Sequence, residues 1–107
     1  MWKIWKYEFK IADEFELELP VMYNILKVDM QHEKPCMWIL VNPTAVKVKR
    51  KFRLFGTGHP IPGGPLWSTP HRKSAAIYQE DGTSLHYIDT IFVRAFVWHL
   101  FESKDDK

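Results

Sequence analysis

The sequence has little of what a disulfide-rich or membrane-spanning protein needs. Cys36 is its single cysteine, which excludes an intrachain disulfide and a cysteine-rich zinc site. No run of apolar residues approaches the roughly 20 that cross a bilayer. Residues 1–16 interrupt their apolar positions with charges, unlike the apolar core of a signal peptide. We therefore expect a cytoplasmic protein without a membrane partner.

The chain also carries little net charge. Its formal charge of +2 is too small to argue for generic nucleic-acid binding. Hydrophobic residues make up 46% and aromatic residues 15% of the chain, and these fractions exclude intrinsic disorder. A chain of 107 residues can build one hydrophobic core, so we expect residues 1–107 to form a single β domain.

The sequence also lacks helical periodicity, because its apolar residues recur mainly at every second position. Residues 15–19 alternate apolar and acidic side chains, as in a half-buried strand. Residues 36–41 are continuously apolar, as in a central strand covered on both faces. Only residues 74–79 suggest a helical turn. Strands are expected at residues 3–9, 15–19, 24–32, 36–41, 52–55, 85–92 and 95–101. The sequence predicts an all-β fold, a single small antiparallel β-sandwich or barrel of about seven strands.

Glycine is missing from most of the chain and concentrates, with proline, in one segment. All five glycines lie between Gly56 and Gly82, and four of the seven prolines lie between Pro60 and Pro70. We expect residues 62–84 to form one long irregular loop inserted into the β domain, and connections of this length are usually functional. Residues 102–107 form a polar tail that is expected to fray.

A basic strand leads into this segment. If residues 47–55 are extended, alternate side chains share a face. The basic face consists of Lys47, Lys49, Lys51 and Arg53, and the core face of Val46, Val48, Phe52 and Leu54. The strand ends at Gly56-Thr57-Gly58-His59, where glycines allow positive φ and backbone N–H groups can surround an anion. Recognition of phosphate or carboxylate by this turn is one interpretation.

The second interpretation of the basic strand is structural. Lysines on an edge strand discourage sheet-to-sheet aggregation. Glu14, Glu16 and Glu18 repeat with the same period and would pair with the lysines across strands, leaving no net field. The Gly-Thr-Gly motif also lacks the longer spacing of a phosphate-binding P-loop. The sequence leaves both interpretations open.

Catalytic and metal-binding signals are sparse. The five histidines lack the close spacing of metal ligands, with a spatial cluster of His59, His86 and His99 as the alternative. We interpret His99 as a sheet histidine with satisfied hydrogen bonds. No serine lies in a Gly-x-Ser-x-Gly elbow, and Cys36 lies in an apolar strand where thiols are inert. We expect no catalytic residue, no metal and no cofactor, and the sequence favours a protein that is not an enzyme.

The glycine- and proline-rich loop carries the remaining ligand candidates, Trp67, His71, Arg72 and Tyr78. Its rings would stack on a base or another ring, and its basic groups would meet a negative charge, so that the loop acts as a lid. Alternatively, the loop is an arm that reaches a neighbouring subunit of a homo-oligomer, or a plain surface loop.

Five motifs spread over nearly the whole chain. They are WKYEF near the N-terminus, PC-x-W-x-LV from Pro35, FR-x-FGTGHPI from Phe52, Tyr87-Ile88-x-Thr90, and FVWHLFE from Phe96. Together they resemble a family of small proteins encoded by tailed bacteriophages and prophages. The resemblance implies a β-rich phage accessory protein in the cytoplasm of an infected bacterium. Phage accessory proteins of this size often act by binding: some sequester nucleotide signals of bacterial immunity, some block defence enzymes, and others attach to virions.

These features predict a phage accessory protein that sequesters a small anionic ligand, such as a nucleotide immune signal, without catalysis. The expected ligand-binding residues are Lys51, Arg53, Gly56, Thr57, Gly58, His59, Trp67, His71, Arg72 and Tyr78. We also expect a homo-oligomer. The alternative is a protein–protein interaction module, either a host-factor inhibitor or a virion-associated protein, with residues 62–83 as its contact surface.

Overall fold

The computed structural model describes residues 1–67 and 76–105, and for residues 65–67 it describes the backbone alone. Nine strands lie in these ranges: β1 (Lys3–Glu8), β2 (Glu14–Pro20), β3 (Tyr23–Gln31), β4 (Lys34–Val41), β5 (Lys47–Gly56), β6 (Gly64–Trp67), β7 (Ala76–Tyr78), β8 (Thr83–Val93) and β9 (Phe96–Asp105). The described ranges contain no helix, and hence none long and apolar enough to cross a membrane.

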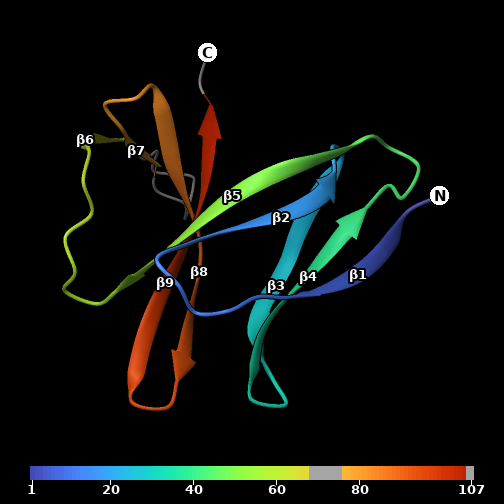
Figure 1. Ribbon diagram of the computed structural model, residues 1–107, viewed down its shortest axis with the longest axis horizontal. Helices are drawn as coiled ribbons and strands as arrows, with labels where there is room; N and C mark the ends of the chain where they lie inside the picture. Colours follow the sequence, from blue (N-terminus) through green and yellow to red (C-terminus); the bar gives the residue numbers. More distant parts are fainter. Residues whose placement is uncertain (68–75, 106–107) are drawn as a thin grey trace.

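The strands form two antiparallel sheets that share one core. The smaller sheet has the order β1-β4-β3, and the larger has the order β2-β5-β9-β8-β7-β6. Figure 1 shows β2 and β5 crossing the upper end of the smaller sheet, while the β3–β4 and β8–β9 hairpins project downward side by side. The predicted all-β antiparallel sandwich is confirmed, and β4 is the central strand of its sheet, as its apolar sequence indicated.

The glycine- and proline-rich segment differs from the prediction. Residues 62–84 were expected to be one irregular loop, but they contain β6 and β7, which extend the larger sheet beyond β8. Residues 76–78, expected in a helical turn, form β7 because Ile77 pairs with Leu85 of β8 and with Leu66 of β6. The structure therefore has nine strands where the sequence predicted about seven.

The C-terminal segment is also more ordered than expected. Residues 102–107 were predicted to fray, yet β9 continues to Asp105, paired with Thr83 of β8. Residues 106–107 lie outside the described residues, so for them the prediction stands untested. The cause of the order at residues 102–105 is Glu102, which is only 2% exposed. Its carboxylate accepts hydrogen bonds from Arg50 Nε at 2.9 Å and from the Tyr23 hydroxyl. A buried carboxylate with two donors holds this end of β9 to both sheets.

The main core lies between the two sheets. Its fully buried side chains include Leu19, Met37, Ile39, Val41, Phe52 and Leu100. Stacked rings bridge the sheets: Phe9 contacts Phe15 at a centroid distance of 4.8 Å, and Phe15 contacts Phe52 at 5.2 Å. Each such side chain contributes roughly 1.5–3 kcal/mol by leaving water, so this layer accounts for most of the stability.

A second, smaller apolar cluster lies on the outer face of the larger sheet. Phe55, Leu85 and Phe101 are buried there, with Ile61, Ile77 and Tyr87 packed against them. The connection after β5 thus covers part of this outer face through Ile61, and Ile77 extends the cluster onto the neighbouring strand β7. The turn that the sequence highlighted lies where β5 passes into this connection.

Candidate functional site

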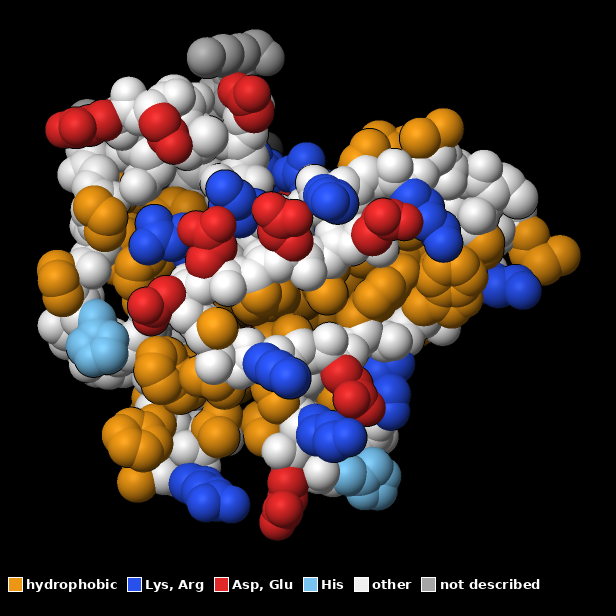
Figure 2. All heavy atoms as spheres, in the orientation of Figure 1, with side chains coloured by type: hydrophobic (Ala, Val, Ile, Leu, Met, Phe, Trp, Pro, Cys, Tyr) orange, Lys and Arg blue, Asp and Glu red, His pale blue; other side chains and the backbone are white. Residues whose placement is uncertain are grey.

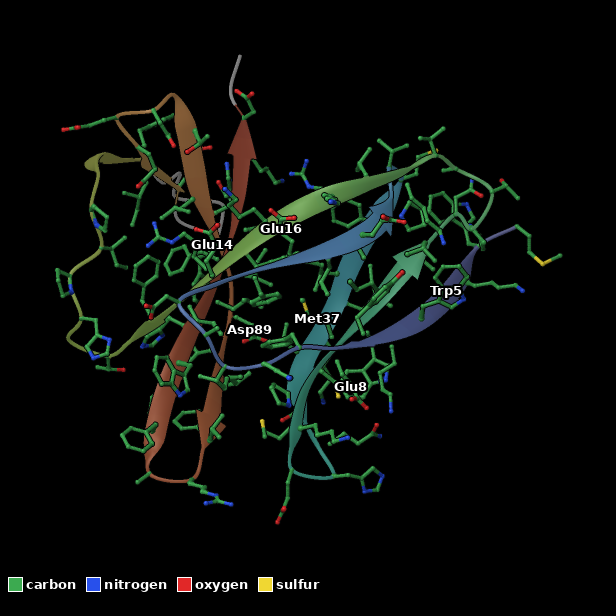
Figure 3. The ribbon with its side chains drawn as sticks, in the orientation of Figure 1. Trp5, Glu8, Glu14, Glu16, Met37 and Asp89 are labelled. Carbon is green, nitrogen blue, oxygen red and sulfur yellow. The ribbon has the colours of Figure 1, made fainter. Side chains whose placement is uncertain are left out.

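The basic face of β5 is matched by the acidic residues of β2. In the antiparallel register, Glu14 pairs with Arg53, Glu16 with Lys51 and Glu18 with Lys49. Figure 3 shows Glu14 and Glu16 along the β2–β5 pair, and Figure 2 shows acidic and basic side chains interspersed over these strands. The expected cross-strand pairing of glutamates with basic residues is confirmed, and neighbouring opposite charges weaken the field of the stripe. The edge-strand part of the structural interpretation was wrong, because β5 lies between β2 and β9 in the larger sheet.

The core face of β5 also follows the prediction in part. Phe52 and Leu54 are buried, but Val46 is 75% exposed, so its assignment to the core was wrong. β5 begins only at Lys47, and Val46 belongs to the preceding loop, where its carbonyl accepts from Val21 N–H.

The two predicted cations of β5 are both engaged. Lys51 Nζ lies 3.3 Å from Glu14 Oε1, in an exposed ion pair. The Arg53 guanidinium lies 4.9 Å from the centroid of the Phe55 ring, and its buried Nε has no hydrogen-bond partner among the described residues. The observed contacts of Lys51 and Arg53 are therefore with Glu14 of β2 and with Phe55 of β5.

Most backbone N–H groups in the turn after β5 already donate hydrogen bonds within the protein. Gly56 N–H donates to His59 Nδ1 at 3.2 Å, and His59 N–H donates to the Gly56 carbonyl at 3.0 Å. Thr57 N–H donates to the Val97 carbonyl of β9 at 3.4 Å. Gly58 supplies the positive φ, +87°, that the turn requires. The expected row of free N–H groups for an anion is therefore absent from Gly56, Thr57 and His59.

Gly56 has a separate role, because the imidazole of His59 lies against it. A Cβ built on Gly56 would come within 2.8 Å of His59 Cε1 and 2.9 Å of Nδ1. Real Cβ contacts are essentially never this short, so any larger residue must displace the ring. The first glycine of the Gly-Thr-Gly-His motif thus makes room for the histidine side chain.

A chain of hydroxyl and imidazole groups continues from the turn across the sheet. Thr57 Oγ1 lies 2.7 Å from His99 Nε2, and His99 Nδ1 lies 2.9 Å from Thr90 Oγ1. Thr90 Oγ1 is in turn 2.5 Å from the Tyr87 hydroxyl. Both ring nitrogens of His99 are hydrogen-bonded, which confirms its interpretation as a satisfied sheet histidine.

The three histidines of the alternative metal cluster have different partners. His99 is bonded to two threonines, His59 to the backbone of Gly56, and His86 to Ser84 Oγ at 2.7 Å. Within the described ranges, no group of three or more His, Cys, Asp or Glu side chains could hold a metal ion.

A pocket of about 300 Å³ lies between the turn and the β8–β9 hairpin. Its lining consists of Gly56, Thr57, His59, Ala95, Phe96, Val97 and Trp98. The His59 ring meets the Trp98 ring edge to face, with centroids 6.2 Å apart. Three predicted residues, Gly56, Thr57 and His59, thus line one pocket. The other wall includes Phe96 and Trp98, which were not predicted. The missed signal is the length of β5: if it extends to Gly56, its pairing with β9 places Trp98 opposite Gly56.

The predicted aromatic lid is not part of this pocket in the described residues. Tyr78 ends β7, is 42% exposed, and pairs with Ser84 and Gly64. His71, Arg72 and the side chain of Trp67 lie outside the described residues, so their assignment stays a prediction.

Two other hollows contain none of the predicted residues. One, of about 480 Å³, is lined by Pro62, Gly63, Gly64, Gln79, Glu80 and Asp81. The other, of about 510 Å³, is lined by Glu8, Phe9, Lys10, Ile11, Lys34 and Pro35. The carboxylates of Glu80 and Asp81 disfavour an anion in the first. In the second, Lys34 already pairs with Glu8 at 3.7 Å.

Comparison with known proteins gives a family but no described activity. No curated protein and no solved structure matches the chain. One family model, described as "Domain of unknown function (DUF7352)", matches residues 1–107. Because that match covers the whole chain, the protein belongs to the DUF7352 family.

Proposed function

We propose that this protein is a non-catalytic binding protein whose small ligand occupies the pocket between residues 56–59 and 95–98. The observation that carries the proposal is the position of the His59 imidazole, which lies against Gly56 and Trp98 at an aromatic-lined pocket. A largely preformed, mostly apolar pocket with few oriented polar groups is the usual form of a small-molecule site. Its volume is at the lower end of the range for such sites.

The hydroxyl–imidazole pair in this site supports binding over catalysis. Thr57 Oγ1 contacts His99 Nε2, as a nucleophile contacts its base. The other nitrogen of His99, however, is bonded to the neutral Thr90 hydroxyl. A carboxylate at that position would stabilise an imidazolium, whereas a hydroxyl stabilises it much less. The chain of groups from Thr57 to Tyr87 therefore fixes the orientation of Thr57 at the pocket.

The proposed ligand differs from the predicted one in where an anionic group would lie. The phage resemblance suggests a small molecule of an infected bacterium, and a nucleotide immune signal is the example it offers. Among the described residues, the pocket lining contains no lysine or arginine. An anionic group of such a ligand would therefore lie outside the pocket, with its ring inside.

Thermal stabilisation by a panel of nucleosides, nucleotides and other small metabolites tests the proposal. A ligand at 100 times its Kd stabilises the folded state by about 2.7 kcal/mol, which raises Tm by several degrees. We expect at least one such shift, and we expect it to disappear in His59→Ala. The matched control is His32→Ala, a histidine on the β3–β4 turn outside the pocket lining. Equal shifts in both variants would contradict the proposed site.

A second function is favoured by the end of the β8–β9 hairpin. Phe92 is 71% exposed and Phe96 is 66% exposed, on either side of the Arg94-Ala95 turn. Figure 2 shows apolar side chains gathered at the lower left, where this hairpin projects in Figure 1. Exposed aromatic residues on a projecting hairpin are typical of a protein contact, including one between copies of a homo-oligomer. We therefore propose this hairpin, rather than residues 62–83, as the surface of an interaction module.

Phe92→Ser separates the two functions, because Phe92 does not line the pocket. If the hairpin is a contact surface, this variant loses self-association in sedimentation velocity and retains the stabilisation by ligand. Sedimentation of the wild-type chain as a monomer at all concentrations would remove the homo-oligomer, and the contact would then require a different protein.

A further inference from the structure

The hydrogen bond between Gly56 and His59 indicates which nitrogen of the imidazole carries the proton. Gly56 N–H donates to His59 Nδ1, so Nδ1 presents a lone pair and the ring proton is on Nε2. An imidazolium has no lone pair with which to accept this bond. In the observed geometry, His59 therefore offers the pocket one N–H donor and no charge.

The rest of the pocket has the same uncharged character. Ala95, Phe96, Val97 and Trp98 contribute apolar and aromatic surface. In the part of the chain that the structure describes, no residue of the lining is lysine, arginine, aspartate or glutamate. A charged group that enters such a site loses its hydration without gaining a counter-ion. A planar ring, in contrast, gains contact with the aromatic walls.

Thr57 can adapt to either polarity of ligand group. If the hydrogen bonds run from Tyr87 through Thr90 to His99 Nδ1, then His99 Nε2 donates to Thr57 and leaves its hydroxyl proton free. If they run in reverse, Thr57 donates to His99 and leaves a lone pair free. In this geometry His59 offers a ligand only a donor, whereas the Thr57 hydroxyl can either donate or accept.

We infer that the ligand places an uncharged, planar heteroaromatic ring in this pocket, with a ring acceptor hydrogen-bonded to His59 Nε2. The inference rests on the proposed function and specifies its ligand class. It also makes Gly56 a positioning residue, because the glycine determines where the imidazole lies. Any anionic group on the same ligand extends into solvent and contributes little to affinity.

Nuclear magnetic resonance of the full chain tests this ligand class. The probes are adenosine, cytidine and nicotinamide as neutral rings with acceptors, indole as a ring with a donor alone, and inorganic phosphate as an anion alone. We expect at least one neutral acceptor ring to shift the His59 imidazole and Trp98 indole signals, with a Kd on the order of 1 mM or below. Indole should bind at least about tenfold more weakly, and phosphate should leave these signals unchanged.

Negative results in this experiment bear on the ring inference and on the proposed function separately. If phosphate shifts the His59 and Trp98 signals while the neutral rings do not, the ring inference is overturned and the pocket remains a ligand site. If none of the probes shifts these signals, the ring inference is likewise overturned. The proposed function is judged separately, by the metabolite panel and its His59→Ala control.

Two variants test the role of His59 itself. Gly56→Ala should displace the imidazole and weaken binding of the best ring probe at least tenfold. The matched control is Gly64→Ala, because a Cβ on Gly64 meets nothing within 4 Å. His59→Phe keeps a planar ring and removes the donor, so it should weaken binding by a similar factor even if Gly56→Ala does not fold. Unchanged affinity in His59→Phe would overturn the hydrogen bond to Nε2.

Discussion

The imidazole of His59 lies so close to Gly56 that a single added methyl group would collide with it. A Cβ at Gly56 would lie 2.8 Å from His59 Cε1, and the same glycine donates its N–H to Nδ1. Gly56 thus leaves the space that the ring occupies and donates a hydrogen bond to one of its nitrogens. A glycine that looks like an ordinary turn residue in the sequence is the residue that shapes the pocket.

Gly56→Ala should therefore cost stability as well as binding. Overpacking a core typically costs about 1–3 kcal/mol, and the cost here should lie at the lower end, because the displaced His59 ring is the end of an exposed side chain. Gly64→Ala should be neutral or stabilising by up to about 1 kcal/mol, because its backbone has no positive φ and the unfolded chain loses freedom. Urea unfolding followed by tryptophan fluorescence measures both. Equal stability of the two variants would show that the ring moves aside without cost.

The buried pair of Arg50 and Glu102 should dominate the electrostatic part of the stability. Arg50 Nη2 lies 2.8 Å from Glu102 Oε2, and their side chains are 26% and 3% exposed. Arg50→Ala leaves a buried carboxylate without its cation, which costs about 3 kcal/mol or more. Lys51→Ala removes an exposed pair with Glu14 and should cost less than about 1 kcal/mol. Similar losses in the two variants, measured by urea unfolding, would contradict this ranking.

Tyr23 should make the protein sensitive to alkaline pH. Burial raises the pKa of its hydroxyl above the ordinary value of 10.0, and the hydrogen bond and charge of Glu102 raise it further. The folded state holds this proton more tightly than the unfolded state, so the contribution is complete below pH 10 and is lost as pH rises above it.

Tyr23→Phe provides the measurement for this pH dependence. The variant should lose about 1.5–3 kcal/mol at pH 7, the usual value for a hydrogen bond to a charged group. Above pH 10, its free energy of unfolding should fall less steeply than that of the wild type. Parallel pH curves for the two proteins would mean that Tyr23 ionises as easily in the folded chain as in the unfolded one.

Phe92→Ser should change association without changing the fold. Because the Phe92 side chain is largely exposed, its removal should alter the free energy of unfolding by no more than about 0.5 kcal/mol. The same change should abolish any concentration-dependent increase in sedimentation coefficient. Val46→Ser, at another exposed apolar residue that is 75% exposed, is the control and should leave association unchanged.

Much of the fold could be predicted because the period-two pattern is strong where one face is buried. The alternation along β2 and the apolar run of β4 identified both strands and their faces. β6 and β7 were missed because they are short, β6 contains Pro65, and eight residues separate the two paired strands. The ordered end of β9 was missed because its cause is a contact between Glu102 and two residues of other strands.

The candidate site could be predicted only in its local part. The glycines and the histidine of residues 56–59 predicted the turn, because a turn depends on the conformational preferences of consecutive residues. Trp98 and Phe96 could not be assigned to the site without the β5–β9 register, which is a non-local property. The anion interpretation gave too much weight to lysines whose partners on β2 were visible in the sequence as the alternating glutamates.

A structure of the protein with its best-binding small molecule tests the central claim most directly. We predict that the ring of the ligand lies against Trp98 and Phe96, with an acceptor atom about 2.7–3.2 Å from His59 Nε2. A ligand bound along the lysine face of β5, or in the hollow beside Glu80 and Asp81, would contradict this prediction.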